Sequence, residues 1–467
     1  MVGGGITGLA AAHRIVELTR ELESPIEVKL LEACPRLGGT ILTQEREGFL
    51  IEGGPDSFIT QKPWALALCK RIGIDDALIP TNPDCRRTFV VRDGLLYPIP
   101  EGFLLLAPSR IWPFLTSGLF SWPCKLRMGL DLILPRKDHG SDGDESLASF
   151  VRRRFGQEAL ERVAQPMVSG IYTADPEELS LRATMPRFLE MESKYRSLIL
   201  AMRRAGKGAA RGKGADSGAR YSLFVSFKHG MATLIDALAA RLPASSVQTN
   251  APVSRVVRDV SDWRIVLADG SSMNADGIVL ACPSYVSATL LGDLDEGLSA
   301  ELRAIRYASS ATMTMAFRRE QIAHRLDGFG FVMPAVEKRT LIAATFSSIK
   351  FAGRAPDGWV LARAFMGGAL HPHVFEMGDQ DLTAHVLEDL RSLIGLQGQP
   401  RFIAIHRWPQ SMPQVPVGHL DRVQRIENQL RSWPGLAVAG NAYAGIGVPD
   451  CVQSGESAAR RVLAQLG

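Results

Sequence analysis

The stretch "MVGGGITGLAAA", residues Met1–Ala12, opens the chain with glycines in the spacing G-x-G-x-x-G. Gly3 suits a tight turn, Gly5 lets a pyrophosphate approach the backbone, and Gly8 lets a helix pack closely on a strand. The small residues that follow would place the positive end of a helix beside the phosphates. The spacing therefore predicts a dinucleotide-binding loop between a strand and a helix.

Only Met1 and Val2 precede this loop, although the strand before such a loop is normally buried on both faces. About four missing apolar side chains, at ~1.5–3 kcal/mol each, would remove roughly 6–12 kcal/mol of burial. That loss is comparable to the net stability of a domain, about 5–15 kcal/mol. We therefore expect the natural polypeptide to begin several apolar residues before Met1.

The composition is that of an ordinary globular enzyme, with 467 residues, 46% of them hydrophobic, and a formal net charge of +4. So small a charge over this length argues against a nucleic-acid partner. The six cysteines include no C-x-x-C pair and no short-spaced zinc set, so we expect reduced thiols, no metal and a cytoplasmic protein. No signal peptide is visible, because glycines and then charged residues interrupt the first apolar run.

The most apolar region is Leu95–Leu134, and it is not predicted to span a membrane. Pro108, Pro113 and Pro123 would break a span, and the basic residues Arg110, Lys125 and Arg127 leave only a short uncharged stretch against the ~20 residues that a span requires. Two interpretations stay open and are compatible. The region either dips into one leaflet of a membrane as a peripheral patch or forms a helical lid over an apolar pocket.

Hydrophobic periodicity predicts the other elements. Alternating glycine turns, helix and strand over residues 3–74 are typical of a doubly wound α/β unit, in which Ile26–Ala33 is the clearest strand. Helical spacing covers Ser146–Arg204, and the Gly/Ala/Lys-rich stretch Arg203–Tyr221 is predicted to be a mobile loop. Apolar alternation around Asp269-Gly270 predicts a hairpin.

The C-terminal half adds further strands and helices. Four strand-like runs between Thr312 and Met366 predict an antiparallel sheet, and a helix is expected near Leu382–Ile394. His371 and His373 lie between them without an acidic or thiol neighbour, so we assign them to a solvated loop. The chain ends with a strand, a glycine-rich loop and a helix.

A second motif follows the first glycine loop. Glu32 ends an apolar run about one βαβ unit later, where a carboxylate can accept hydrogen bonds from ribose hydroxyls. Arg36, Gly38 and Gly39 come next, and the pattern E-A-x-x-R-x-G-G resembles the FAD-binding signature of the amine-oxidase-like flavoprotein superfamily. This pattern favours FAD over a nicotinamide cofactor and makes Arg36 a candidate cation for the pyrophosphate.

Five further blocks, in order and spread over nearly the whole chain, are similar to those of the protoporphyrinogen and coproporphyrinogen III oxidase family. They are Phe49–Phe58, Ser169–Pro186, Phe224–Leu238, His406–His419 and Ala437–Gly455. The resemblance implies oxidation of coproporphyrinogen III or protoporphyrinogen IX in haem biosynthesis. Six electrons would leave the macrocycle in three two-electron steps and pass through FAD to dioxygen.

The resemblance also carries over site residues. Because the flavin accepts the hydride, no catalytic residue is assigned. Propionate groups need cations, and Arg86 or Arg87 lies where the family can place a carboxylate-binding arginine. The implied FAD contacts are Gly3, Gly5, Gly8, Glu32, Arg36, Gly39, Gly54, Val253, Trp408, Gly440, Asn441 and Val448.

The implied fold class is α/β, with a discontinuous Rossmann-like FAD-binding domain of the glutathione-reductase type, a helical insert and an α+β substrate-binding domain. The FAD-binding domain takes residues 1–86, 222–290 and 406–467. The helical insert, 87–221, faces substrate or membrane, and the substrate-binding domain takes 291–405. A homodimer and a peripheral membrane contact are compatible with this arrangement.

Two other functions stay open. The first is another enzyme of the superfamily, an amine oxidase or a desaturase, although the C-terminal loop offers only Tyr443 where an aromatic pair would hold an amine. The second is a membrane-associated protein that binds flavin or porphyrin without catalysis. Bound flavin that a porphyrinogen bleaches would separate these alternatives from the oxidase.

Overall fold

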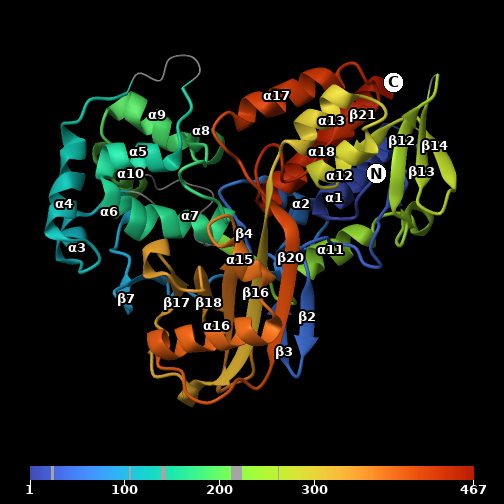
Figure 1. Cartoon of the computed structure of the whole chain (residues 1–467). Helices are drawn as coiled ribbons and strands as arrows, with labels where there is room; N and C mark the ends of the chain where they lie inside the picture. Colours follow the sequence, from blue (N-terminus) through green and yellow to red (C-terminus); the bar gives the residue numbers. More distant parts are fainter. Residues whose placement is uncertain (23–25, 105–106, 138–142, 212–222, 261, 467) are drawn as a thin grey trace.

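The computed structural model describes residues 1–22, 26–104, 107–137, 143–211, 223–260 and 262–466 of the chain. Figure 1 shows a helical part at the upper left, an α/β part with both chain ends at the upper right, and a large sheet below them. In the described part of the chain, no helix is both long and apolar enough to cross a membrane.

A parallel sheet forms the core of the α/β part. Val2 makes parallel bridges with Leu31 on one side and Leu280 on the other. The sheet order is therefore β11, β1, Val2, β15, β21. The predicted strand Ile26–Ala33 is reduced to β1 in the middle of that range. The paired strands are β1 (Leu30–Leu31), β11 (Val247–Gln248), β15 (Ile278–Leu280) and β21 (Leu436–Val438).

Two long helices, α1 (Ile6–Leu22) and α18 (Val448–Leu466), pack against each other on this sheet. At Gly455 a Cβ atom would lie 2.2 Å from the carbonyl oxygen of Thr7, so only glycine permits this approach. Each helix follows a strand of the same parallel sheet, so both begin at its carboxyl edge. Shorter helices α2 (Trp64–Arg71) and α11 (Ala232–Ala239) complete this layer.

Small sheets and helices surround the α/β part. A three-stranded antiparallel sheet confirms the hairpin predicted around Asp269-Gly270. The elements of this region are β12 (Val253–Arg258), β13 (Trp263–Leu267), β14 (Ser272–Ala275), β4 (Phe58–Ile59), β5 (Leu78–Pro80), β10 (Phe224–Phe227), α12 (Ser284–Leu290), α13 (Glu296–Arg303) and α17 (His419–Leu430).

The lower sheet has seven strands, and the antiparallel pairing predicted for residues 312–366 is confirmed. Helix α16 (Asp379–Ile394) packs on one face, and the hairpin of β2 (Thr43–Arg46) and β3 (Phe49–Glu52) on the other. In sheet order the strands are β20 (Ile403–Pro413), β16 (Tyr307–Arg318), β19 (Trp359–Gly367), β18 (Ala343–Phe346), β17 (Gly328–Val332), β6 (Arg87–Arg92) and β7 (Leu95–Pro98).

Two of the expected domain boundaries do not coincide with the limits of this sheet. Strands β6 and β7 lie inside the segment expected as the helical insert, but they hydrogen-bond into the large sheet. Strand β20 runs across the boundary expected at residue 405. We therefore propose to group residues 87–98 and all of β20 with the sheet. Two short helices, α14 (Ser347–Lys350) and α15 (Pro372–Glu376), adjoin it, and α15 replaces part of the loop expected around His371 and His373.

The helical part has its own apolar core. Helix α10 continues to Arg211, so the predicted loop is wrong for residues 203–211, and the rest of that loop lies outside the described residues. The elements are β8 (Phe103–Leu104), β9 (Ala107–Pro108), α3 (Ile111–Thr116), α4 (Trp122–Gly129), α5 (Leu147–Phe155), α6 (Gln157–Ala159), α7 (Gln165–Tyr172), α8 (Leu181–Thr184), α9 (Pro186–Tyr195) and α10 (Leu198–Arg211).

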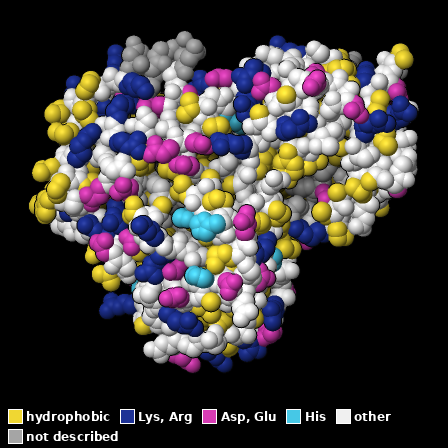
Figure 2. Space-filling model, in the orientation of Figure 1, with side chains coloured by type: hydrophobic (Ala, Val, Ile, Leu, Met, Phe, Trp, Pro, Cys, Tyr) yellow, Lys and Arg dark blue, Asp and Glu magenta, His cyan; other side chains and the backbone are white. Residues whose placement is uncertain are grey.

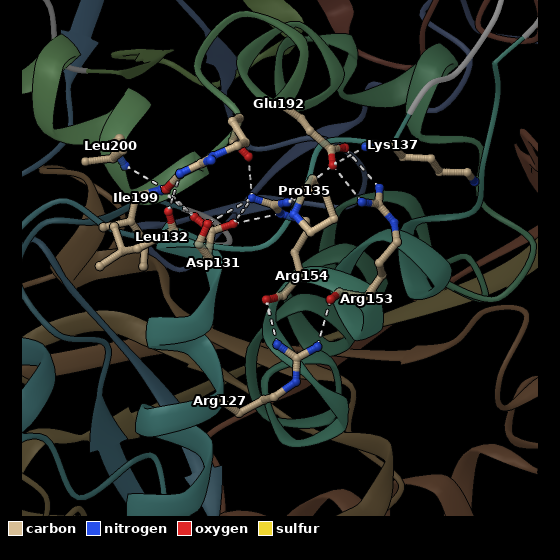
Figure 3. A network of polar contacts seen from close by, with 12 residues as sticks. Arg127, Asp131, Leu132, Pro135, Lys137, Arg153, Arg154, Glu192, Ile199 and Leu200 are labelled. Carbon is tan, nitrogen blue, oxygen red and sulfur yellow. Dashed lines mark hydrogen bonds and ion pairs between the residues drawn. The ribbon is translucent and has the colours of Figure 1, made fainter.

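A fully buried ionic network joins the elements of this helical part (Figure 3). Arg154, Asp131 and Glu192 have no exposed side-chain surface. The Arg154 Nε donates to an Asp131 oxygen at 2.7 Å, and Arg154 also pairs with Glu192. Asp131 accepts further hydrogen bonds from the Ser197 hydroxyl at 2.6 Å and the Ile199 amide at 3.0 Å. The network therefore ties α5 to α9 and to the start of α10.

We expect Arg154→Met to destabilise the helical part by about 3–5 kcal/mol, because the buried Asp131 loses its cation while Glu192 keeps Arg153. Urea unfolding followed by tryptophan fluorescence measures the loss. The matched control is Arg152→Met on the same helix. Arg152 pairs with Glu177 at the surface, where its side chain is 43% exposed, so the control should cost at most about 1 kcal/mol. Equal effects of the two variants would contradict the prediction.

Candidate functional site

The two glycine loops lie against each other. Gly5 makes a parallel bridge with Gly38, and the Gly38 amide donates to the Gly4 carbonyl at 2.9 Å. A Cβ on Gly8 would lie 1.9 Å from the Gly3 carbonyl oxygen, whereas a Cβ on Gly5 would meet nothing within 4 Å. Gly8 is therefore needed for helix packing, and Gly5 leaves its backbone open to a ligand. This arrangement fits the dinucleotide that the spacing predicts.

Glu32 lies at the carboxyl edge of β1, beside the first glycine loop. One carboxylate oxygen accepts from the Gly4 amide at 2.6 Å and the other from the Cys34 amide at 2.8 Å. The Glu32 carbonyl accepts from the Ala251 amide at 2.9 Å, two residues before Val253 begins β12. The structure thus brings Glu32 and the Val253 segment to the first glycine loop.

Arg36 closes the second glycine loop. Its guanidinium donates to the carbonyl oxygens of Gly39 at 2.6 Å, Ile41 at 3.1 Å and Leu37 at 3.2 Å. The loop holds Gly39 beside Gly5, because a Cβ on Gly39 would lie 3.4 Å from the Gly5 Cα. The Arg36 charge therefore lies next to the expected phosphate position, and its role as a phosphate ligand stays a prediction.

A third stretch, Gly53-Gly54 after β3, is held by three neighbouring strands of the large sheet. The Gly53 carbonyl accepts from the Thr312 hydroxyl at 2.9 Å, the Arg363 guanidinium at 3.2 Å and the Trp408 indole at 2.9 Å. Arg363 also donates to the Gly54 carbonyl. Two of the predicted flavin contacts, Gly54 and Trp408, are thus fixed relative to each other.

Sequence reasoning missed Thr312 and Arg363. The available signal was polar residues within the apolar strand runs TMTMAF and WVLARAFM. Arg363 is only 3% exposed, and burial lowers the pKa of its guanidinium while Asp56 and Glu52 oppose that shift. Such a buried cation needs partners, and the carbonyls of the Gly53-Gly54 stretch provide them.

Asp56 follows this stretch and forms a partly buried ion pair with Lys350 of α14, in which each side chain is 15% exposed. The Lys350 Nζ lies 3.1 and 3.0 Å from the two carboxylate oxygens, and the Ser57 hydroxyl donates to Asp56 at 2.7 Å. Burial alone would raise the pKa of Asp56, but Lys350 and then Arg363 outweigh it and lower the pKa to about 2. Asp56 is therefore an ionised anchor between the α/β part and the large sheet.

The C-terminal loop and the start of α18 carry three more of the predicted flavin contacts. The Gly440 amide donates to the Ser454 hydroxyl at 3.0 Å, and the Asn441 side-chain amide donates to the Ser411 carbonyl of β20 at 3.3 Å. Val448 begins α18 at the same sheet edge where α1 begins. Two positive helix ends therefore face the place where the phosphates and the flavin are expected.

One face of the large sheet extends from the Gly53-Gly54 stretch towards the helical part. Residues paired directly across strands share a face, and one such row runs Val332, Ala343, Phe365, Thr312 and His406. Thr312, next to His406 at one end of the row, contacts the Gly53 carbonyl, and α7 approaches Val332 at the other end. The row crosses three strand spacings from Val332 to Thr312, about 14 Å. It is our candidate floor for a flat substrate.

The predicted propionate ligands lie on β6 and the loop before it. Arg87 is 65% exposed on its side chain and pairs with Asp327 at 2.7 Å, and Arg86 is exposed. Their role stays a prediction. The His371 and His373 rings lie 6.2 Å apart. Within the described ranges, no group of three or more His, Cys, Asp or Glu residues is arranged to hold a metal ion.

We expect Gly5→Ala and Gly8→Ala to fail in different ways. A methyl group at Gly5 enters open space, so the apoprotein should keep its melting temperature while its affinity for FAD falls at least tenfold. A methyl group at Gly8 collides with the Gly3 carbonyl, so that variant should lose stability even without cofactor. Melting curves and flavin-fluorescence titrations distinguish the two, and equal FAD affinity in Gly5→Ala and wild type would contradict this assignment.

We expect Lys350→Met to lose about 2 kcal/mol of stability at pH 7, because Asp56 then keeps a partly buried charge without its main partner. The folded pKa of Asp56 is about 2 against an ordinary value of 3.8, so the pair stabilises the fold above pH 4. The difference between wild type and variant should stay constant above pH 4 and shrink as the pH falls towards 2. Denaturant unfolding over that range tests this, and a difference that grows on acidification would contradict it.

Comparison with known proteins agrees with this geometry. Residues 6–463 match the family described as flavin containing amine oxidoreductase. The chain is 34% identical to coproporphyrinogen III oxidase from Bacillus subtilis (strain 168), covering 100% of this chain and 98% of that protein. It is 36% identical to coproporphyrinogen III oxidase from Propionibacterium freudenreichii subsp. freudenreichii, covering 99% and 90%.

A solved structure is similar over the same length. It is that of a protein from Exiguobacterium sp. 255-15, a proposed protoporphyrinogen oxidase, with a TM-score of 0.87 and 32% identity. The match covers 99% of this chain and 98% of that one. The similarity therefore includes the helical part and the large sheet as well as the nucleotide-binding part.

Proposed function

Because the chain belongs to the flavin-containing amine oxidoreductase family, within its porphyrinogen oxidase branch, we propose that it binds FAD and oxidises coproporphyrinogen III with dioxygen as the acceptor. It is an oxidoreductase of haem synthesis that removes hydrogen from a porphyrinogen. We favour coproporphyrinogen III over protoporphyrinogen IX because two bacterial relatives carry that name. The observation that supports FAD most directly is the open backbone at Gly5 between two positive helix ends.

When bound, FAD supplies the hydride acceptor for the reaction. The protein then has to hold the flavin and to orient a flat macrocycle beside it. The Gly53 carbonyl, with its three donors, fixes the loop that carries Gly54, and the sheet row from Val332 to Thr312 provides a floor. Asp56 stays ionised and paired with Lys350 at neutral pH, so it anchors the site and is a poor proton acceptor.

The amine oxidase alternative is disfavoured by Tyr443. This residue is 8% exposed and packs in the apolar cluster around Leu280 and Leu302. Burial raises the pKa of its hydroxyl well above the ordinary value. Tyr443 therefore does not present a free aromatic face to an amine.

The deciding experiment compares coproporphyrinogen III, protoporphyrinogen IX and a polyamine with the flavin-loaded protein. We expect bleaching of the flavin and peroxide release with the porphyrinogens, and a higher kcat/KM with coproporphyrinogen III. A colourless protein that does not bind added FAD would overturn the proposal. Turnover of the polyamine alone would move the chain to the amine oxidase alternative, and bound flavin without bleaching would favour the non-catalytic one. Light scattering tests the homodimer.

Arg87→Ala should raise KM several-fold more than it lowers kcat, because it removes a cation that we propose for a propionate and leaves the flavin unchanged. Asp327→Asn is the matched control, since it removes the surface partner of Arg87 and keeps the cation. It should leave KM unchanged or lower it. Unchanged KM values in both Arg86→Ala and Arg87→Ala would end this assignment.

We also propose that the helical part contacts a membrane surface through an apolar tip. We define the tip as the exposed side chains of α3, α4 and the turn after α4, which gather at the left of Figure 2. Trp112 is 78% exposed, Leu126 71%, Ile133 69% and Trp122 64%. Large apolar patches mark interaction sites, and tryptophan favours the membrane interface.

Liposome flotation tests the tip. Wild-type protein should float with vesicles that contain anionic lipid, and Trp112→Ser combined with Leu126→Ser should weaken that binding at least tenfold by removing inserted apolar area. The control is Val336→Ser, which removes an exposed apolar side chain (44% exposed) from the large-sheet part. Equal flotation of all three proteins would remove the membrane from the proposal.

A further inference from the structure

An ion pair joins the chain before α2 to the first turn of α18. The Lys62 Nζ lies 2.7 Å from each carboxylate oxygen of Asp450. The Asp450 side chain is only 5% exposed, whereas the Lys62 side chain is 44% exposed. Lys62 thus reaches from the surface to cover a buried carboxylate. Neither residue is among the predicted cofactor or substrate contacts.

Asp450 is the third residue of α18 and folds back on the loop before the helix. Its Oδ2 accepts from the Gly447 amide at 3.2 Å. A carboxylate at this position commonly accepts from the amide that precedes a helix and so fixes the helix start. That local role explains the carboxylate, but it needs no cation. The bidentate approach of Lys62 from a distant segment is therefore a separate feature.

The position of the Asp450 carboxylate explains why a cation at Lys62 would matter. Val448, a predicted flavin contact, begins the helix two residues before Asp450, so the buried charge lies within one turn of the expected flavin. A negative charge there disfavours adding electrons to the ring, whereas a helix N-terminus favours it. The Asp450 charge also contributes, after burial, to the rise of the pKa of Tyr172 on α7 to about 12. The electrostatic field of the Asp450 carboxylate therefore extends into the space between α18 and the helical part.

We propose that Lys62 is a positioning residue that neutralises Asp450, so that the N-terminus of α18 presents net positive potential to the bound flavin and raises its reduction potential. The inference rests on the proposed binding of FAD. Lys62 acts through Asp450 and through the field at the helix start, and it needs no contact with substrate. It makes the flavin a stronger oxidant in every one of the two-electron steps.

The experiment is a double-mutant cycle on the charges of Lys62 and Asp450, carried out at pH 8 on the flavin-loaded protein without any porphyrinogen. A redox dye sets a fixed potential, and the measured quantity is the ratio of reduced to oxidised flavin. Lys62→Met leaves the carboxylate uncompensated, so the ratio should fall about tenfold, which is about 30 mV for a two-electron couple. Asp450→Asn keeps an oxygen for the Gly447 amide and removes the charge, so the ratio should rise. The double variant should return to within about twofold of wild type, and Lys62→Arg should match wild type.

Two controls separate this role from a structural one. Arg425→Met removes one cation from an exposed pair with Glu301 and should leave the ratio unchanged. FAD affinity is measured in parallel, because a purely structural ion pair would change the affinity for FAD and not the reduction potential. The effects of the two single variants would then not cancel in the double variant. If Lys62→Met does not fold, Asp450→Asn alone still decides the sign.

Unchanged ratios in Lys62→Met and Asp450→Asn with bound flavin would overturn this proposal and leave the proposed function intact. A wild-type protein that binds no FAD would overturn both.

Discussion

Close backbone contact at glycine positions is the constraint on which the rest of the structure depends. A Cβ on Gly8 would lie 1.9 Å from the Gly3 carbonyl, and a Cβ on Gly455 would lie 2.2 Å from the Thr7 carbonyl. These contacts let α1 pack closely over the first glycine loop and α18 pack closely on α1. Because both helices follow strands of one parallel sheet, both positive ends arrive at one edge. Any larger side chain at either glycine would move a helix away from that edge.

The Gly53 carbonyl connects this edge to the large sheet. Donors from β16, β19 and β20 meet on one oxygen atom, and the partly buried Asp56–Lys350 pair adds a second connection a few residues later. Hydrogen bonds of this kind are directional, so they fix orientation as well as distance. The loop next to the expected flavin is therefore placed by the sheet that forms the candidate substrate floor. A displacement of the sheet would move both together.

Pairing with a cation satisfies carboxylates at three places in the described part of the molecule. Arg154 pairs with the buried Asp131 and Glu192, Lys62 with the buried Asp450, and Lys350 with the partly buried Asp56. An unpaired charge in such places would be costly, and pairing removes most of that cost without adding much net stability. In the helical part the result is rigidity. At the helix start of α18 the same device also sets the field at the cofactor position.

The sequence by itself determined the glycine loop, the Glu32 and Arg36 motif, the family and the antiparallel strands of the large sheet. The two motifs and the strands are local, because each depends on spacing within one stretch or on a repeat along one strand, and the family follows from several such stretches in a fixed order. The sequence did not reveal the three donors on Gly53, the Lys350 and Lys62 pairs, or the extension of α10 to Arg211. Lys62 and Asp450 are far apart in the chain, and Thr312, Arg363 and Trp408 come from three separate strands. Only packing of the sheet against the hairpin and the helices brings such groups within hydrogen-bond distance, so the tertiary structure alone decided them.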